Sequence, residues 1–430
     1  MLTREENELL CRVEGDAPMG QLMRRHWIPA CLTEELTEAD GDPVPVRLLG
    51  EDLVAFRDTD GRVGVMDRYC PHRRASLVFG RNEDCGLRCL YHGWKVDVEG
   101  NVLEMPSEPA ASALVQKVKH KAYATHEHGG FVWVYMGPRE AMPAFRPPPF
   151  APTADARLAI VKIAVDCNWA QILEGAIDSA HSSTLHSTDM TPARVDGAKA
   201  TADAWLRPST DKAPRLVLEK TDYGFKYAAI RRPITNANVN DYVRISVFVA
   251  PISVLIPPNN LYNVANVNVP IDDTHTMFHF IAWTEGEQGA VDTEAWRKFC
   301  HAQVGIDVDR EFKKVRTLAN RYLQDRKAMR LGDFTGIPGI PNQDIAMWET
   351  MGPIADRTHD RLGASDLAIV EFRRIMVEAA GRMRDRGEAL GSGVEASHVR
   401  SFEGIVAKGA EWRTLGETIP LQSAKEASPA

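Results

Sequence analysis

Two short segments of the chain each combine a cysteine with a histidine. Cys70-Pro-His72 is followed, after sixteen intervening residues, by Cys89-Leu-Tyr-His92. Two thiolates and two imidazoles can hold Zn²⁺, or a [2Fe–2S] cluster with both cysteines on one iron and both histidines on the other. Zinc sites usually group cysteine with cysteine and histidine with histidine, whereas each segment here is mixed. The spacing therefore favours the cluster over a zinc ribbon.

A second group of candidate ligands lies between Asn168 and His186. Glu174, Asp178 and His181 are spaced to share one face of a helix, and His186 follows His181 by five residues. This differs from the i, i+4 histidine pair of a zincin, and the serines and threonine between the two histidines disfavour a helix interior. We therefore expect the helix to end or bulge here. Two converging imidazoles need one carboxylate to form the 2-His-1-carboxylate face of a non-haem Fe(II) oxygenase.

Two aspartates are candidates for that carboxylate. Asp344 stands in the segment Pro341-Asn-Gln-Asp-Ile-Ala-Met-Trp-Glu349, and Asp189 follows His186 by three residues. An aspartate such as Asp344 could also serve only as a helix N-cap. The residues alone leave both candidates open.

The motif Cys70-Pro-His72…Cys89-Leu-Tyr-His92-Gly-Trp resembles the cluster motif of the Rieske non-haem iron oxygenases that hydroxylate aromatic rings. The resemblance extends from a lead-in at 19–29, Met-Gly followed by Arg-x-x-Trp-x-Pro, to about residue 390. It is closest to the phthalate dioxygenase type of oxygenase (alpha) component. That subgroup acts on aromatic carboxylates and ring ethers.

The resemblance implies one Rieske [2Fe–2S] cluster and one mononuclear Fe(II) per chain. In the family, a carboxylate that opens a late helix, with a glutamate five residues on, completes the iron site, and Asp344 matches that position. The expected metal ligands are therefore His181, His186 and Asp344. The expected cluster ligands are Cys70, His72, Cys89 and His92.

Asp178 has a separate expected role, because it precedes His181 by three residues. A carboxylate there could accept a hydrogen bond from the ligand and fix its tautomer without binding the metal. The resemblance implies that it also bridges to the second cluster histidine, His92, of a neighbouring subunit. We therefore expect a catalytic Asp178 and a homotrimer, or a hexamer of stacked trimers. Glu174 is either a supporting carboxylate or a simple helix-face acid.

The function implied by the resemblance is that of the oxygenase component of a multicomponent dioxygenase. A flavin or iron–sulfur reductase would supply electrons from NAD(P)H, and O2 would cis-dihydroxylate an aromatic carboxylate, either phthalate-like or a substituted benzoate. Within the enzyme class, the alternative is a monooxygenase or O-demethylase of an aromatic acid or ether. The alternative from another class is a pure Rieske electron carrier, which would need no second metal.

Recognition of an anionic substrate would require arginine, whose planar fork meets a carboxylate in two parallel bonds. The segment Tyr242–Ala250 alternates as a strand, and Arg244 lies on the face opposite its valines. Arg207, in Trp205-Leu-Arg-Pro208, is a second candidate. Ser179 and Ser182, beside the first expected iron ligand, could also reach the substrate.

The elements that must position these residues fall into two expected domains of an α+β protein. Residues 1–40, with a helix at 5–14, should wrap around an all-β Rieske domain at 41–150. The proline-rich stretch 137–152 marks the boundary, because proline removes donors and fixes φ. Residues 151–415 should form a helix-grip-like catalytic domain, in which helices at 168–181, 293–329 and 365–386 surround an antiparallel sheet. Residues 416–430 are expected to be a disordered tail.

Composition agrees with an ordinary globular protein of two domains. The chain has 430 residues and a formal net charge of −8, which argues against a nucleic-acid binder. We expect neither a membrane span nor a signal peptide, because the sequence offers no apolar run of sufficient length and no basic N-terminal stretch. Seven cysteines, an odd number at low density, favour the reducing cytoplasm, with Cys85 as a spare thiol.

Overall fold

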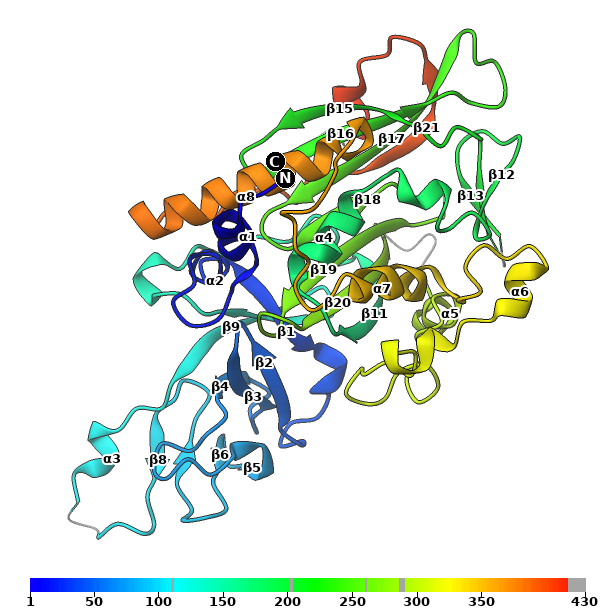
Figure 1. Ribbon diagram of the computed structural model, residues 1–430. Helices are drawn as coiled ribbons and strands as arrows, with labels where there is room; N and C mark the ends of the chain where they lie inside the picture. The colour runs from blue at the N-terminus through cyan, green and yellow to red at the C-terminus, as the bar shows by residue number, and fades with distance from the viewer. Residues whose placement is uncertain (110–111, 202–203, 260, 286–290, 417–430) are drawn as a thin grey trace, which may run out of the picture.

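The computed structural model describes residues 1–416 except 110–111, 202–203, 260 and 286–290. The expected disordered tail, 416–430, lies outside the described residues apart from its first position. The N-terminal part contains an antiparallel sheet of order β1-β10-β9-β4-β3-β2 (Figure 1). Its strands are β1 (Trp27–Leu32), β2 (Val44–Leu48), β3 (Glu51–Arg57), β4 (Val63–Asp67), β9 (Ala122–His128) and β10 (Phe131–Tyr135).

The hairpin between β3 and β4 illustrates how the sequence directs this sheet. Arg57 pairs with Val63, and the turn between them places Gly61 at φ +79°. Asp58 caps the turn, because its carboxylate accepts from the backbone N–H of Arg62 at 2.8 Å. The aspartates and glycine of this turn therefore set the register of the strands that precede the first cysteine–histidine segment.

A smaller antiparallel sheet follows and carries both cysteine–histidine segments at its edge. Its strands are β5 (Arg81–Glu83), β6 (Gly86–Arg88), β7 (Lys95–Val96) and β8 (Val102–Glu104). The segment 70–72 lies in the loop between β4 and β5, and 89–92 lies in the loop between β6 and β7. The two loops therefore belong to one compact unit, at the end of the molecule remote from α4 and α7 (Figure 1).

The C-terminal part is built on an eight-stranded antiparallel sheet. Its order is β11-β20-β19-β18-β17-β16-β15, and β21 pairs with β17. The strands are β11 (Arg157–Val165), β15 (Arg215–Lys220), β16 (Gly224–Arg231), β17 (Asn240–Val249), β18 (Ser253–Ile256), β19 (Asn263–Pro270), β20 (Thr276–Thr284) and β21 (Phe402–Ala407). A small sheet, β12 (Met190–Pro192), β13 (Lys199–Ala200) and β14 (Trp205–Arg207), lies at one side.

Helices cover this sheet and meet at its centre. α4 (Trp169–Ile177) contacts β17, β18 and β19, and it packs against α7 (Ile340–Thr350) and α8 (Leu367–Arg386). The short N-terminal helices α1 (Arg4–Cys11) and α2 (Pro18–Met23) also pack on α8, which links the start of the chain to its end (Figure 1). Short helices α3 (Leu114–Lys117), α5 (Thr293–Phe299) and α6 (Arg326–Arg330) complete the set.

The predicted helix at 293–329 is wrong. α5 ends at Phe299, and the chain turns at once because His301 adopts φ +50°. Asp307 and Asp309 then hold the following loop, since their carboxylates accept from the backbone N–H groups of Gln303 and Lys313. These aspartates compete with helical hydrogen bonding, which the apolar spacing of the segment did not reveal. The helix expected at 365–386 is present as α8.

The predicted helix at 168–181 is also too long. It begins as expected, with the Asn168 side chain capping the backbone N–H of Ala170 at 3.1 Å, but it ends at Ile177. Asp178 follows in extended conformation, and His181 begins the separate 3-10 turn η4 (His181–Ser183).

Among the described residues, no helix has both the length and the apolar character that a membrane span requires.

Candidate active site

The two loops of the N-terminal domain bring two thiols and two imidazoles together. The loops are tight, with Arg74 N–H donating to the Cys70 carbonyl at 2.9 Å and Gly93 N–H donating to the Cys89 carbonyl at 3.0 Å. Both cysteines are buried, and the imidazole centroids of His72 and His92 lie 4.4 Å apart.

The donors in these loops fit the cluster. His72 stacks on Trp94 at 4.6 Å, and its Nδ1 is buried without a hydrogen-bond partner among the described residues. A buried imidazole nitrogen left without a partner is costly unless a ligand occupies it. A pair of thiols and a pair of imidazoles suits a [2Fe–2S] cluster with mixed ligation. Around this unit the surface carries exposed apolar side chains, Leu90 and Tyr91.

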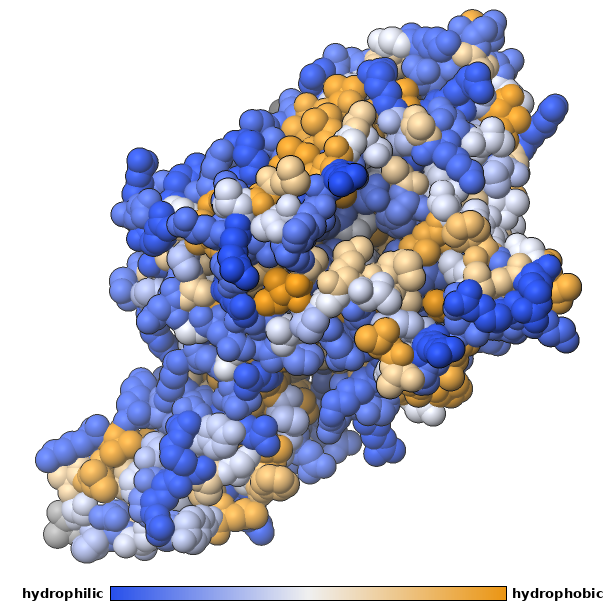
Figure 2. Space-filling view, in the orientation of Figure 1, coloured by the Kyte–Doolittle hydropathy of each residue, from blue (hydrophilic) through white to orange (hydrophobic). Residues whose placement is uncertain are grey.

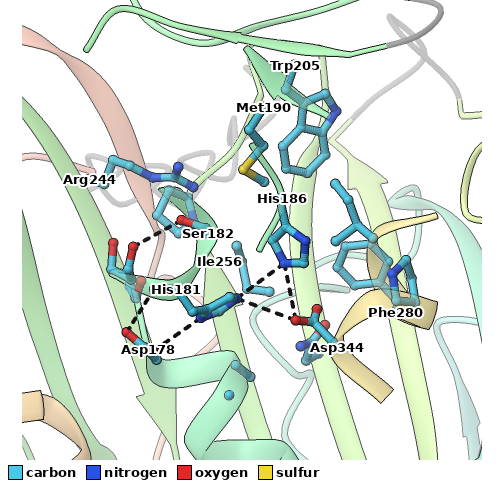
Figure 3. Close-up of a pocket in the computed structure, with 18 of the residues that line it drawn as sticks. Asp178, His181, Ser182, His186, Met190, Trp205, Arg244, Ile256, Phe280 and Asp344 are labelled. Atoms are coloured by element: carbon cyan, nitrogen blue, oxygen red, sulfur yellow. Dashed lines mark hydrogen bonds and ion pairs between the residues drawn. The ribbon is translucent and has the colours of Figure 1, made fainter. Parts of the chain in front are cut away.

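Three side chains of the C-terminal domain converge on one point (Figure 3). His181 Nε2 and His186 Nε2 lie 3.3 Å apart, and Asp344 Oδ1 lies 3.5 Å from the first and 3.2 Å from the second. Ligands at right angles around a metal, with bonds of about 2.1 Å, are separated by about 3 Å. The spacing and the donor set fit one divalent ion with a 2-His-1-carboxylate face.

Different elements supply the three donors. η4 and the turn after it present the two histidines, and α7 presents Asp344 from one turn beyond Gly339. Asp189 does not belong to this converging group. Its carboxylate instead accepts from the side-chain amide of Gln343 at 2.7 Å.

Asp178 lies behind His181. Its carboxylate is 3.4 Å from His181 Nδ1 and accepts from the backbone N–H of Ala180 at 2.7 Å. Burial raises the pKa of Asp178, but these donors outweigh it and lower the pKa below its usual value. Burial lowers the pKa of His181, and the contacts with Asp178 and Asp344 reverse that effect, so the pKa is raised. Asp178 can therefore hold a charged hydrogen bond to this imidazole.

The helix ends at Ile177, so it does not place Glu174 and His181 on one continuous helical face. Glu174 pairs with Arg357 at 2.7 Å and with Arg373 at 2.8 Å. Arg357 also donates to the side-chain oxygen of Asn7, which belongs to α1. Glu174 thus ties α4 to α8 and to the N-terminal helix.

A cavity of about 580 Å³, part of it open to solvent, adjoins the three converging donors. Its walls are mostly apolar, as is usual for small-molecule sites. They include Met190, Trp205, Ile256, Phe278 and Phe280. Polar residues of the lining include Ser179, Ser246 and Asn266. Figure 3 shows two more, Ser182 and Arg244, on the side of the cavity away from Phe280.

Among the residues that the structure describes, Arg244 is the one arginine that lines this cavity. It is buried, its Nε has no partner among the described residues, and its guanidinium lies 3.9 Å from Glu403 across the β17–β21 pair. Burial, with the charges of Arg207 and Arg231, lowers the pKa of Arg244 well below its usual value. A bound anion beside Arg244 would offset the positive charge that Arg244, Arg207 and Arg231 together place at this part of the wall.

Arg207 is buried behind the wall rather than in it. Its guanidinium donates to the hydroxyls of Ser183 at 3.0 Å and Ser182 at 3.2 Å. Arg231 similarly donates to the Ser179 carbonyl at 2.7 Å. These two arginines hold the segment that carries His181.

Three buried polar groups near the site are not among the candidate residues that the sequence predicted. Arg231 and Glu403 reach Arg244 only because β16 and β21 flank β17, and strand pairing between distant segments leaves no local signal. Asn266 lies on β19, and its side-chain oxygen is buried without a partner among the described residues. A polar residue inside an apolar strand is the signal that could have singled it out.

A second hollow opens on the opposite side of the three donors. Asp178, His181 and Asp344 line it, together with exposed apolar side chains of Phe334, Met347 and Met351. Figure 2 shows apolar side chains gathered on the face around α7. The converging donors thus lie between an inner cavity and an outer groove.

Two family models match the chain, the Rieske [2Fe-2S] domain over residues 26–122 and the LigXa C-terminal domain like family over 134–428. The chain is 66% identical to the phthalate 4,5-dioxygenase oxygenase subunit of Pseudomonas putida, over 96% of this chain and 94% of the relative. It is 36% identical to the 3-chlorobenzoate-3,4-dioxygenase oxygenase subunit of Comamonas testosteroni, over 97% of this chain and 98% of the relative.

Solved structures share the fold. The terminal oxygenase of carbazole 1,9a-dioxygenase from Nocardioides aromaticivorans IC177 superposes with a TM-score of 0.56 at 18% identity, over 87% of this chain and 96% of that chain. The predicted fold class, a Rieske domain followed by a catalytic domain with an antiparallel sheet and surrounding helices, is confirmed. The chain belongs to the phthalate dioxygenase-like Rieske non-haem iron oxygenases, as the oxygenase component of an aromatic-ring dioxygenase.

Proposed function

We propose that this oxygenase cis-dihydroxylates an aromatic carboxylate, phthalate-like or a substituted benzoate. The observation that carries the proposal is Arg244, a buried cation in the wall of an otherwise apolar cavity beside His181, His186 and Asp344. The two relatives named above act, by their names, on phthalate and on 3-chlorobenzoate. Both of those compounds are aromatic carboxylates.

We assign the cluster to Cys70, His72, Cys89 and His92, and a mononuclear Fe(II) to His181, His186 and Asp344. When bound, the iron supplies the O2 chemistry and the cluster supplies electrons one at a time. A reductase that draws on NAD(P)H is the partner this requires. All seven cysteines are free in the structure, which fits a reducing cytoplasm.

The chain's own residues bind and orient the substrate. Arg244 would meet a ring carboxylate with two parallel hydrogen bonds. Trp205, Phe278 and Phe280 would hold the ring and exclude water. Ser179 and Ser182, on the cavity wall, could add hydroxyl contacts, and Arg207 would act through Ser182 rather than by direct contact.

We further propose that Asp178 links centres of different subunits. Within one chain the cysteine–histidine loops lie far from α4 and α7 (Figure 1). The outer groove instead exposes Asp178, and the exposed Leu90 and Tyr91 next to His92 offer an apolar surface for it. A neighbouring subunit docked there would bring its His92 to Asp178, which calls for a trimer or stacked trimers.

Product analysis with a panel of aromatic acids tests the proposed reaction. The expected product is a cis-dihydrodiol that carries both atoms of isotope-labelled O2. Loss of formaldehyde from a methoxybenzoate, with no diol from any acid, would favour the O-demethylase alternative. That alternative has support, because the chain is 32% identical to the 5,5'-dehydrodivanillate O-demethylase oxygenase subunit of Sphingobium sp. (strain NBRC 103272 / SYK-6), over 87% of this chain and 79% of the relative. The full-length match to oxygenase subunits argues against a pure electron carrier.

A further inference from the structure

Gln343 joins His186 to Asp189 through a chain of short hydrogen bonds. It is 2% exposed and immediately precedes Asp344 on α7. Its side-chain oxygen lies 2.6 Å from His186 Nδ1. Its side-chain nitrogen donates to Asp189 Oδ2 at 2.7 Å and to the Ile337 carbonyl at 2.9 Å. All polar atoms of this amide are therefore engaged.

The partners of Gln343 determine which way the amide faces. The Ile337 carbonyl can only accept a hydrogen bond, so the NH₂ group must point toward it, whatever the protonation of Asp189. The amide oxygen must then face the imidazole. An oxygen 2.6 Å from His186 Nδ1 requires that this nitrogen carry the proton. In the neutral imidazole, which is the form that binds a metal, His186 Nε2 is then the unprotonated nitrogen, and it is the one that faces His181 and Asp344.

We propose that Gln343 is a positioning residue that holds His186 in its metal-binding tautomer. Asp189 and the Ile337 carbonyl in turn fix the orientation of the Gln343 amide. This inference rests on the proposed iron site. His186 is itself only 2% exposed, so bulk water is a poor substitute for the amide oxygen. Partners of this kind orient imidazole ligands and raise their affinity for metal about ten- to a hundredfold.

The arrangement makes the two histidines unequal. His181 is backed directly by the carboxylate of Asp178, whereas His186 is backed by a neutral amide with a carboxylate one step further away. A neutral amide can accept the hydrogen bond but cannot take the proton. His186 thereby keeps its proton on Nδ1 and a fixed orientation. Within the described residues, Asp178 remains the only carboxylate in contact with an Nδ1 of the pair.

Titration with Co²⁺ of holoprotein stripped of mononuclear iron, with its cluster intact, tests the proposal. Gln343→Leu removes the acceptor, and we expect Co²⁺ to bind about ten- to a hundredfold more weakly. Asn342→Leu is the matched control, because Asn342 is a buried amide on the same turn whose donors reach only backbone carbonyls, at 3.0 Å for His301 and 3.1 Å for Pro338. This control should bind Co²⁺ like the wild type.

The outcomes separate this inference from the proposed function. If wild-type protein takes up no second metal, the iron site itself fails. If wild type binds Co²⁺ and folded Gln343→Leu binds it equally well, or if Asn342→Leu loses as much, the role of Gln343 is overturned. Should Gln343→Leu not fold, Asp189→Ala takes its place, since Asp189 contacts the amide and not the imidazole. We expect Asp189→Ala to lose less Co²⁺ affinity than Gln343→Leu. An unchanged affinity would contradict the proposed role of Gln343.

Discussion

At the scale of single residues, the site depends on three donor atoms that lie within 3.5 Å of one another. We predict that His186→Ala and Asp344→Ala each lose the mononuclear iron and the oxygenation activity while the cluster remains. Iron analysis should then fall from about three atoms per chain to about two, with the cluster's paramagnetic signal unchanged. Asp189→Ala, which contacts the site only through Gln343, should weaken metal binding modestly and keep most of the iron. Retained iron in Asp344→Ala with complete loss in Asp189→Ala would reverse the choice of carboxylate.

Arg244 is the residue that should select the substrate's charge. Removal of one charge-assisted pair costs about 1.5–3 kcal/mol, which corresponds to about a ten- to a hundredfold loss of affinity. We predict that Arg244→Ala weakens binding of a carboxylated ring by this factor and leaves binding of the uncarboxylated ring unchanged. Equilibrium binding to the oxidised protein measures both. Equal losses for the two ligands would mean that Arg244 supports the fold of the cavity and not the charge.

Residue types and spacing were sufficient to predict much of this site, because metal ligands need particular side chains. The histidines at 181 and 186 were found in this way, whereas Asp344 was preferred to Asp189 because of the family resemblance. The three side chains do converge. Gln343, Asn266 and Glu403 could not be foreseen, since an amide or a carboxylate acquires its role only from the partner that folding places beside it. The sequence left the role of Glu174 open, because its partners Arg357 and Arg373 come from distant parts of the chain.

At the scale of elements, the close approach of α4 and α7 determines where the donors meet. Gly175 on α4 makes this approach feasible, because a Cβ there would lie 2.1 Å from the indole nitrogen of Trp348 on α7. We predict that Gly175→Ala displaces α7, destabilises the protein by about 1–3 kcal/mol and lowers the iron content. Urea unfolding and iron analysis measure the two effects.

Gly381 provides the matched control for that substitution. It lies within α8, and a Cβ there meets nothing within 4 Å. Gly381→Ala should be neutral or stabilise the protein by up to about 1 kcal/mol, because alanine has the higher helix propensity. Equal stability of the two variants would show that the α4–α7 contact does not constrain the site.

The strand predicted at Tyr242–Ala250 from its alternating residues is present as β17 (Asn240–Val249). The failures lie where side chains compete with backbone hydrogen bonds. In the 301–313 loop, aspartate side chains bond to backbone N–H groups where a helix was expected. Helix α4 ends at Ile177, one turn earlier than expected. Apolar periodicity does not contain these local contacts, so they could not be foreseen.

At the scale of the whole molecule, the two domains meet around His279. Its ring contacts Phe131 of β10 edge-on at 5.3 Å, and Lys162 beside it pairs with Glu35. Burial lowers the pKa of His279 to about 3, and burial similarly lowers the pKa of His26 to about 4. Both histidines are therefore neutral in the folded protein.

This burial predicts acid sensitivity. Above pH 6.5 the two histidines are neutral in the folded and unfolded states alike, and below it the unfolded chain takes up protons first. The free energy of unfolding should therefore fall as the pH drops from 6.5 toward 4, by about 2 kcal/mol per histidine at pH 5. Urea midpoints at pH 7.5 and pH 5 measure it. His279→Gln should reduce the difference, whereas His359→Gln, at an exposed position, should not.

Asp178 is the residue through which electrons are proposed to pass from one subunit to the next. Asparagine is nearly isosteric but uncharged, so Asp178→Asn should keep the oligomer, the cluster and most of the iron while losing the charged hydrogen bonds. We predict that its cluster still accepts an electron from the reductase and then stays reduced in the presence of substrate and O2. Reoxidation at the wild-type rate would reduce Asp178 to an ordinary loop carboxylate and remove the route between subunits.

The central claim is that electrons stored in the cluster drive dihydroxylation of an aromatic carboxylate at the His181–His186–Asp344 site. A single turnover of fully reduced wild-type protein with phthalate and O2, without reductase, tests it most directly. We predict that the cluster's reduced paramagnetic signal disappears as a cis-dihydrodiol forms, with oxidation much slower when phthalate is omitted. Cluster oxidation at the same rate with and without phthalate, and no hydroxylated product, would contradict the account.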